Sequence, residues 1–258
     1  MNSPAITVII ATHNRATLLR RALASLLAQQ LPCHEIIVVS DVSDSGTYAV
    51  ANELLRKGDV FAQRPGIPGP AASRNLALKL VTGTDVVFLD DDDAFKPDFL
   101  ANVAAARAQG LPQEILFTSF EVIHEHSGGE LIPVNLAPFA LEQVWIKNFI
   151  PNNCLVYPAP VVKDLFYDES IAYEDWDFVL SAHARAPLRH VPINGPLIYK
   201  NANAEQAARG EENNAHLLEC YIRTYQKHPA TAAVREQRKA FFAGVGIDIE
   251  ACMQRDRA

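Results

Sequence analysis

The first hundred residues alternate apolar, β-branched runs with helical segments, and this alternation constrains the fold more than any other feature. The pattern predicts strands at residues 6–11, 35–39, 60–63 and 85–89, and helices at residues 16–29, 47–56 and 70–81. Strands separated by helices of this length form βαβ units with parallel strands and helices on both faces. The sequence therefore predicts an α/β fold with a mostly parallel central sheet.

The remainder of the chain is less regular. We expect a helix at 97–109, a long strand at 114–124 with a hairpin return at 130–134, an irregular proline-rich stretch at 137–160 and a helix at 174–183. The tail, residues 211–254, is mostly helical, with breaks near His228-Pro229 and Gly244–Gly246. A chain of 258 residues makes one large domain or two small ones.

Polar residues follow three of the predicted strands. Thr12-His13-Asn14 follows the first strand, Asp41 the second, and four consecutive aspartates, residues 90–93, follow the strand at 85–89. Ligands bind at the carboxyl ends of parallel strands. The sequence therefore predicts a site at this edge of the sheet.

The run of four aspartates favours a bound cation. Adjacent carboxylates repel and raise each other's pKa, so the run contributes little to stability by itself. Oxygen ligands suit a hard cation, and Asp90 and Asp92 point to the same side of an extended segment, roughly 7 Å apart. A solvated acidic turn before a helix is the alternative.

Composition restricts the partners and the compartment. The net charge of −7 argues against nucleic-acid binding. The four cysteines have no metal-ligand spacing, which is typical of reduced thiols in a cytoplasmic protein. No stretch predicts a membrane span or a secretory signal. Acidic and basic residues balance in the tail, so it is no polybasic anchor, and peripheral attachment to the inner face of a membrane stays open.

The order of these motifs resembles the family 2 glycosyltransferases, which have the Rossmann-like GT-A fold. Five segments in the right order carry the resemblance, over roughly residues 5–200. They are TVIIATHNR (7–15), EIIVVSD (35–41), PAASRN (70–75), FLDDDD (88–93, with Pro97-Asp98 just after) and YEDWD (173–177).

The resemblance implies a nucleotide-sugar donor held at the strand ends. It places the base beside Ala11, Thr12 and His13, and makes Asp41 the acid that reads the base. Arg74 would pair with the aspartates or with the diphosphate, and Asp90 and Asp91 would face the ribose, Arg74 or other supporting groups. Helix caps, an Asx-turn and a structural ion pair are the simpler interpretations.

The resemblance also implies a metal ligand and a base. Asp92 would bind Mn²⁺ or Mg²⁺, which bridges the two phosphates, and Asp93 would serve the turn or a cap. Asp175 would be the catalytic base of an inverting enzyme, although acids at a helix N-terminus are common. Trp176 would line the acceptor pocket or pack in the core. Asn152 and Asn153 would hold sugar hydroxyls or form a turn.

The chain departs from the family pattern in two places. Ser40 and Val42 replace the usual neighbours of the base-reading acid, which leaves the base identity open. Many family members have a histidine near Tyr199 as a further metal ligand, and this chain has Asn201 and Asn203 as poor substitutes. Metal binding would then rest on Asp92 and the diphosphate.

The resulting expectation is an inverting, metal-dependent glycosyltransferase of bacterial surface polysaccharide synthesis. It would transfer a sugar, most simply from a UDP-sugar, to a hydroxyl of a glycan or a lipid-linked acceptor. The GT-A domain would span residues 1–200, with a nucleotide-sugar-binding half at 1–95 and an acceptor-binding half at 96–200. The helical extension at 201–258 would cap the acceptor site, form a homodimer or touch a membrane.

Two other functions compete with this expectation. A non-catalytic nucleotide-sugar-binding module would explain the two departures, but it would not need both Asp92 and Asp175. A nucleotidyltransferase would normally have a glycine-rich phosphate loop after the first strand, and residues 11–15 contain no glycine.

Overall fold

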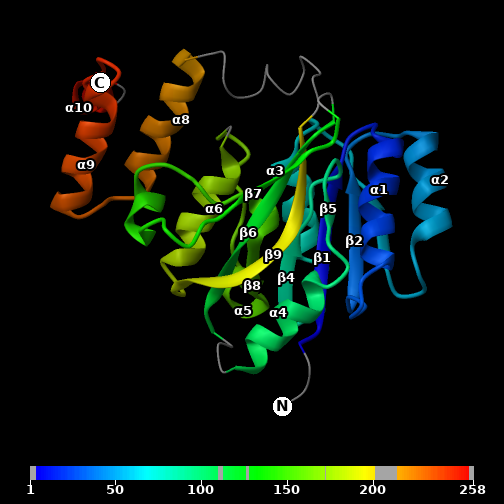
Figure 1. Ribbon diagram of the computed structural model, residues 1–258. Helices are drawn as coiled ribbons and strands as arrows, with labels where there is room; N and C mark the ends of the chain where they lie inside the picture. The colour runs from blue at the N-terminus through cyan, green and yellow to red at the C-terminus, as the bar shows by residue number, and fades with distance from the viewer. Residues whose placement is uncertain (1–3, 110–112, 126–127, 172, 201–213, 256–258) are drawn as a thin grey trace.

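The computed structural model describes residues 4–109, 113–125, 128–171, 173–200 and 214–255. Its strands form one sheet in the order β3-β2-β1-β4-β8-β6-β9-β5, with β7 paired to β6 (Figure 1). The strands are β1 (Ile6–Thr12), β2 (Glu35–Ser40), β3 (Val60–Gln63), β4 (Asp85–Phe88), β5 (Ala94–Phe95), β6 (Ile115–His124), β7 (Leu131–Val134), β8 (Leu155–Pro158) and β9 (Leu188–Lys200).

The first four strands are parallel, as the sequence predicts. β1 lies between β2 and β4, with Ile9 opposite Ile37 and Phe88. β2 is buried along its whole length and β1 nearly so, which explains why both read as continuous apolar runs. β6 and β9 run in the same direction as these strands, whereas β5, β7 and β8 run against their neighbours. The mostly parallel sheet and the α/β class are confirmed.

Helices cover both faces of the sheet. They are α1 (Ala16–Leu27), α2 (Ser45–Leu54), α3 (Pro70–Leu78), α4 (Phe99–Ala108), α5 (Ala159–Val162), α6 (Glu174–His183), α8 (Asn214–Lys227), α9 (Ala232–Ala243) and α10 (Ile249–Arg255), with short 3-10 helices η2 (Leu141–Trp145) and η3 (Asn152–Cys154). None of the helices in the described part of the chain is both long enough and apolar enough to cross a membrane.

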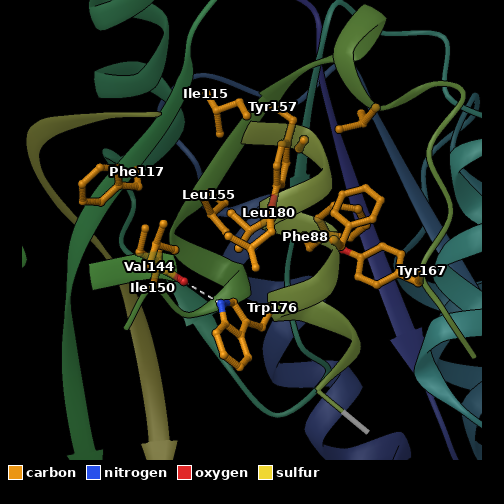
Figure 2. Packing of buried hydrophobic residues seen from close by; sticks show 14 of the residues in the cluster. Phe88, Ile115, Phe117, Val144, Ile150, Leu155, Tyr157, Tyr167, Trp176 and Leu180 are labelled. Carbon is orange, nitrogen blue, oxygen red and sulfur yellow. Dashed lines mark hydrogen bonds between the residues drawn. The ribbon is translucent and has the colours of Figure 1, made fainter. Parts of the chain in front are cut away.

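The two faces of the sheet carry separate apolar cores, because successive side chains of a strand point to opposite sides. Val8 and Ile10 pack with α1 and α4 on one face, and Ile9 packs with α3 and α6 on the other. Figure 2 shows the second core, in which Phe88 and Tyr167 lie close to each other.

The C-terminal helices share this second core. Tyr221 and Tyr225 of α8 contact the Trp176 ring at centroid distances of 5.0 and 5.8 Å. Trp176 is 2% exposed, and its indole N–H donates to the Val144 carbonyl at 2.7 Å (Figure 2). Of the two roles expected for Trp176, the structure therefore supports core packing. α8, α9 and α10 stack beside α6 (Figure 1).

The sequence pattern missed three strands of the sheet, β5, β8 and β9. β8 lies within the stretch expected to be irregular, and β9 follows α6. β8 has four residues and ends at Pro158, and it is stabilised by antiparallel pairing with β4 and β6, which are distant in sequence. β9 contains Pro192, Gly195 and Pro196, and such residues weaken a strand pattern in the sequence. The helix expected at 97–109 begins two residues later, at Phe99, with Asp98 at its N-cap position.

Asp177 anchors the C-terminal helices to α6. Its carboxylate is fully buried and accepts hydrogen bonds from the Lys227 ammonium at 2.8 Å and from His228 Nε2 at 2.7 Å. The same ammonium also reaches Asp168 at 2.9 Å, whose side chain is 30% exposed. The two carboxylates therefore bind one cation in two different environments.

Asp177→Asn should lower the free energy of unfolding by about 2 to 3 kcal/mol, because hydrogen bonds to charged groups contribute about 1.5 to 3 kcal/mol each when buried. Asp168→Asn is the matched control and should cost less than about 1 kcal/mol, as exposed ion pairs do. Urea denaturation followed by circular dichroism measures both. Equal costs for the two variants would contradict the anchoring role of Asp177.

Candidate active site

The predicted polar strand ends meet at one edge of the sheet. Thr12 ends β1, Asp41 follows β2, and the aspartates at 90–93 follow β4. The Thr12 hydroxyl donates to Asp91 Oδ2 at 2.7 Å, which joins the first strand end to the third. The N–H of Asp93 donates to the Asp90 carbonyl at 3.1 Å, so the run closes into a tight turn. We call residues 90–93 the acidic turn.

Asp90 is the member of the acidic turn that binds Arg74. Arg74 Nη2 lies 2.8 Å from Asp90 Oδ1, and Arg74 Nη1 lies 2.8 Å from Glu174 Oε1 at the start of α6. The Arg74 side chain is 9% exposed and stands over the Tyr167 ring, 5.4 Å from its centroid. Arg74 is therefore a buried bridge between the acidic turn and α6, consistent with its predicted pairing to the aspartates.

Asp91 is held by a different pair of donors. Besides the Thr12 hydroxyl, it accepts from Arg15 Nη1 at 3.1 Å. Burial raises the pKa of Asp91 to about 6, although the Thr12 hydrogen bond and the Arg15 charge oppose this rise. Its two oxygens are thus committed to β1 and to the start of α1, which makes Asp91 a supporting residue of the turn.

Asp92 is the member of the acidic turn expected to bind a cation, and it is less exposed than Asp90, whose side chain is 39% exposed. The Asp92 side chain is 14% exposed, and Arg15 Nη1 lies 3.2 Å from Oδ2. Within the described residues, no group of three or more His, Cys, Asp or Glu side chains is arranged to hold a metal ion. Magnesium sites are commonly built from one or two carboxylates together with substrate phosphates. The donor set therefore fits a cation shared with a bound diphosphate better than one held by protein alone.

Asp93 has a larger structural role than the expected turn or cap residue. It is buried, it accepts from the Tyr199 N–H at 2.8 Å and it is hydrogen-bonded to Asn153 Nδ2. Burial, and then the charges of Asp90 and Asp92, raise the pKa of Asp93 well above its ordinary value. Asp93 fastens the acidic turn to β9 and to η3.

Asn153 holds the acidic turn through both ends of its side-chain amide. Its Oδ1 accepts from the Asp90 N–H at 3.1 Å while its Nδ2 reaches Asp93. The side chain is 1% exposed, so in this structure it braces the turn rather than facing the expected sugar hydroxyls. The residues that would follow Tyr199 in the metal site, Asn201 and Asn203, lie outside the described residues.

His13 and Asp41 form a close pair at the ends of β1 and β2. His13 Nδ1 lies 2.6 Å from Asp41 Oδ1, and the Gly69 N–H donates to Asp41 Oδ2 at 2.7 Å. The Asp41 side chain is 4% exposed, whereas the His13 side chain is 50% exposed. Ala11 pairs with Val39 in the strand ladder, so it contributes backbone at this edge.

Asp175 lies in the first turn of α6, beside the Arg74 bridge. Its Oδ2 accepts from Asn148 Nδ2 at 3.4 Å, and its Oδ1 accepts from the Trp176 N–H at 2.7 Å. Burial, and then the charge of Glu174, raise the pKa of Asp175 to about 6, while Arg74 opposes this rise. A carboxylate with a pKa near 6 can take a proton at neutral pH more readily than an ordinary aspartate.

Sequence reasoning missed Arg15, Asn148 and Glu174 as members of this network. Arg15 lies inside the first motif, so a signal for it was present, but the pattern does not say which aspartates it binds. Asn148 reaches Asp175 from the irregular segment before η3. Glu174 stands next to the expected base, and only the fold brings it to Arg74.

A cavity of about 790 Å³ lies away from this network. Its lining includes Leu78, Asp85, Arg107 and Val162, at the opposite end of β4 from the acidic turn. None of the predicted site residues lines it, so the chemistry of this cavity is separate from that of the strand ends.

The sequence model of the family described as "Glycosyl transferase family 2" matches residues 7–121, which contain the β1, β2 and β4 strand ends described above. Over these residues the chain is similar to this family of glycosyltransferases. The match includes His13, Asp41, Arg74 and the acidic turn, and the remaining part of the site, on α6, lies beyond it.

The chain is also similar to a protein named as a glycosyltransferase and to one named for succinoglycan biosynthesis. EpsH of Bacillus subtilis (strain 168), a glycosyltransferase by name, is 27% identical over 242 residues, which are 85% of this chain and 70% of EpsH. The succinoglycan biosynthesis protein ExoO of Rhizobium meliloti (strain 1021) is 28% identical over 207 residues, 72% of this chain and 59% of ExoO. The chain thus spans 59 to 70% of the length of these two relatives.

Solved structures share the fold of this chain. The Staphylococcus aureus TarS 1–349 structure, in complex with UDP-GlcNAc, has a TM-score of 0.70 at 20% identity and covers 92% of this chain and 71% of its own. The mannosyltransferase PcManGT from Pyrobaculum calidifontis, in complex with GDP-Man and Mn²⁺, has a TM-score of 0.59 at 16% identity. The match covers 100% of this chain and 80% of PcManGT. The GT-A fold expected from the motifs is confirmed.

Asn153→Ala should lower the free energy of unfolding by about 2 to 3 kcal/mol, because it leaves the buried Asp93 carboxylate and the Asp90 N–H without their shared partner. Asn152→Ala is the control. Asn152 is also buried, but its Nδ2 has no hydrogen-bond partner among the described residues. Its loss should cost clearly less, and urea denaturation of the two variants decides. An equal cost would remove Asn153 as the brace of the acidic turn.

Proposed function

We propose that this protein is an inverting, metal-dependent glycosyltransferase that transfers a sugar from a UDP-sugar to a hydroxyl of a glycan or a lipid-linked acceptor. The observation that carries the proposal is the Arg74 bridge, which connects the acidic turn to the α6 start that bears Asp175. The proposed leaving-group site is thereby tied to the first turn of α6, which carries the proposed base. The names of the relatives support a place in bacterial surface polysaccharide synthesis.

The donor would lie across the carboxyl end of β1. Its base would rest beside Ala11, His13 and Asp41, and its diphosphate would reach the acidic turn. Thr12 and His13 are neighbours in sequence, yet Thr12 binds Asp91 and His13 binds Asp41. This short stretch would therefore join the base-binding end of the donor site to its phosphate-binding end. The UDP-GlcNAc held by the TarS structure supports uridine as the base of the donor.

Asp92 would hold the Mn²⁺ or Mg²⁺ ion together with the phosphates. Bound there, the ion would offset the negative charge that develops on the leaving diphosphate. Arg15 already compensates part of the charge on Asp91 and Asp92. We therefore expect the cation to bind weakly in the absence of nucleotide.

Asp175 would act as the base of the transfer step. Its carboxylate would take the proton of an acceptor hydroxyl as that oxygen bonds to the anomeric carbon. The bond from the anomeric carbon to the diphosphate breaks on the opposite side, and its electron pair leaves with the nucleoside diphosphate, so the configuration inverts. Asn148 and the Trp176 N–H hold the carboxylate in place.

The proposal also divides the chain. Residues 1–95 would bind the donor, residues 96–200 would bind the acceptor, and residues 201–258 would form a helical extension. The cytoplasm is the proposed setting. Peripheral attachment to the inner face of a membrane and a homodimer through the C-terminal helices are arrangements left to test.

A panel of UDP-, GDP-, CDP- and ADP-sugars with Mn²⁺ tests the donor and the metal. We expect a UDP-sugar to raise the melting temperature and to be hydrolysed slowly, since water can replace the acceptor. Asp92→Asn should remove the Mn²⁺-dependent part of UDP binding in titration calorimetry, whereas Asp98→Asn, which removes an exposed carboxylate six residues further along the chain, should not. Unchanged UDP–Mn²⁺ affinity in Asp92→Asn would refute the metal assignment, and absence of nucleotide binding would refute the proposed function.

The pH dependence of turnover tests Asp175. Because its pKa is raised to about 6 and the base must be ionised, kcat/KM should be flat at neutral pH and fall about tenfold per unit below pH 6. Glu174→Gln removes a neighbouring negative charge, so the acid limb should move to lower pH. Asp175→Asn should bind the donor and lose transfer by about a thousandfold or more. Full activity in Asp175→Asn would exclude this residue as the base.

A further inference from the structure

The carboxylate expected to read the nucleobase is already occupied within the protein. Asp41 Oδ1 lies 2.6 Å from His13 Nδ1, and Oδ2 accepts from the Gly69 N–H at 2.7 Å. Arg64 Nη2 lies a further 3.8 Å from Oδ2. With a side chain that is 4% exposed, Asp41 has little surface left for a ligand, whereas the His13 ring beside it is 50% exposed.

The pairing with Asp41 determines which ring nitrogen of His13 carries the proton. An ionised carboxylate only accepts hydrogen bonds, so His13 Nδ1 must carry the proton that lies between the two groups. In a neutral imidazole the other nitrogen, Nε2, is then a lone-pair acceptor. Among the described residues, the His13 ring is hydrogen-bonded to Asp41, through Nδ1. Nε2 is therefore the ring nitrogen left to meet a ligand.

We infer that His13 Nε2, oriented by Asp41, accepts the ring N–H of the donor's base and so makes His13 a specificity-determining residue. The inference rests on the proposed function and names the class of base that the site takes. Uracil and guanine carry a ring N–H on the edge that faces a reader. Cytosine and adenine carry a bare nitrogen there, which would set two acceptors against each other.

The position of His13 agrees with this role. The preceding residue, Thr12, binds the acidic turn through Asp91, so a nucleotide whose diphosphate meets that turn has its base toward the β1–β2 edge. The Gly69 N–H, just before α3, donates to the second carboxylate oxygen of Asp41, Oδ2. The carboxylate thus acts on the base through His13 and not by direct contact.

Titration calorimetry with the full chain and Mn²⁺ tests the inference, using UDP, GDP, CDP and N3-methyl-UDP as probes. The wild type should bind UDP or GDP at least about tenfold more tightly than CDP and N3-methyl-UDP, because a mismatched base leaves acceptors unpaired. His13→Phe keeps an aromatic ring and removes the acceptor, so it should bind UDP and N3-methyl-UDP equally. His13→Gln, whose amide oxygen can replace Nε2, should restore part of the preference.

The outcomes distinguish a failure of the His13 inference from a failure of the proposed function. If His13→Phe, shown to be folded by its thermal transition, keeps the full preference for UDP over N3-methyl-UDP, another group reads the base and the inference is overturned while the proposed function stands. If the wild type binds all four nucleotides equally, His13 reads nothing and the inference also fails. If the wild type binds none of them, the proposed function falls, and this inference falls with it.

Discussion

The site depends on one buried guanidinium. Arg74 stands between Asp90 and Glu174, at 2.8 Å from each, and Asp175 follows directly. These carboxylates come from the end of β4 and the start of α6, two elements far apart in sequence. Without a buried cation their charges would repel and open the edge of the sheet. Arg74 therefore allows a cluster of acids to lie at the surface of a well-packed core.

The acidic turn illustrates how four identical side chains acquire different roles. Asp91 is bound by Thr12 and Arg15, and Asp93 is fastened to β9 and η3. Asp90 belongs to Arg74. Asp92 is 14% exposed and lies 3.2 Å from Arg15, and it is the proposed ligand of the metal. Burial and donors, and not residue type, separate the members of the run.

Much of the fold could be predicted from sequence, because β1, β2 and β4 are continuous apolar runs and the tail helices break at Pro229 and Gly244. β8 and β9 could not, since their stability comes from pairing across the sheet. The strand-end residues were also predictable, whereas their partners were not. The local sequence pattern does not predict the hydrogen bond between His13 and Asp41, because it forms only when β1 and β2 pair.

A crystal structure of Asp175→Asn with UDP and Mn²⁺ tests the account most directly, through the anomalous signal of the metal. We expect a single manganese peak between the diphosphate and Asp92, with the uracil against His13. Arg74 should still pair with both Asp90 and Glu174. A manganese ion bound to Asp91 or Asp93, or a nucleotide bound away from the carboxyl end of β1, would contradict it.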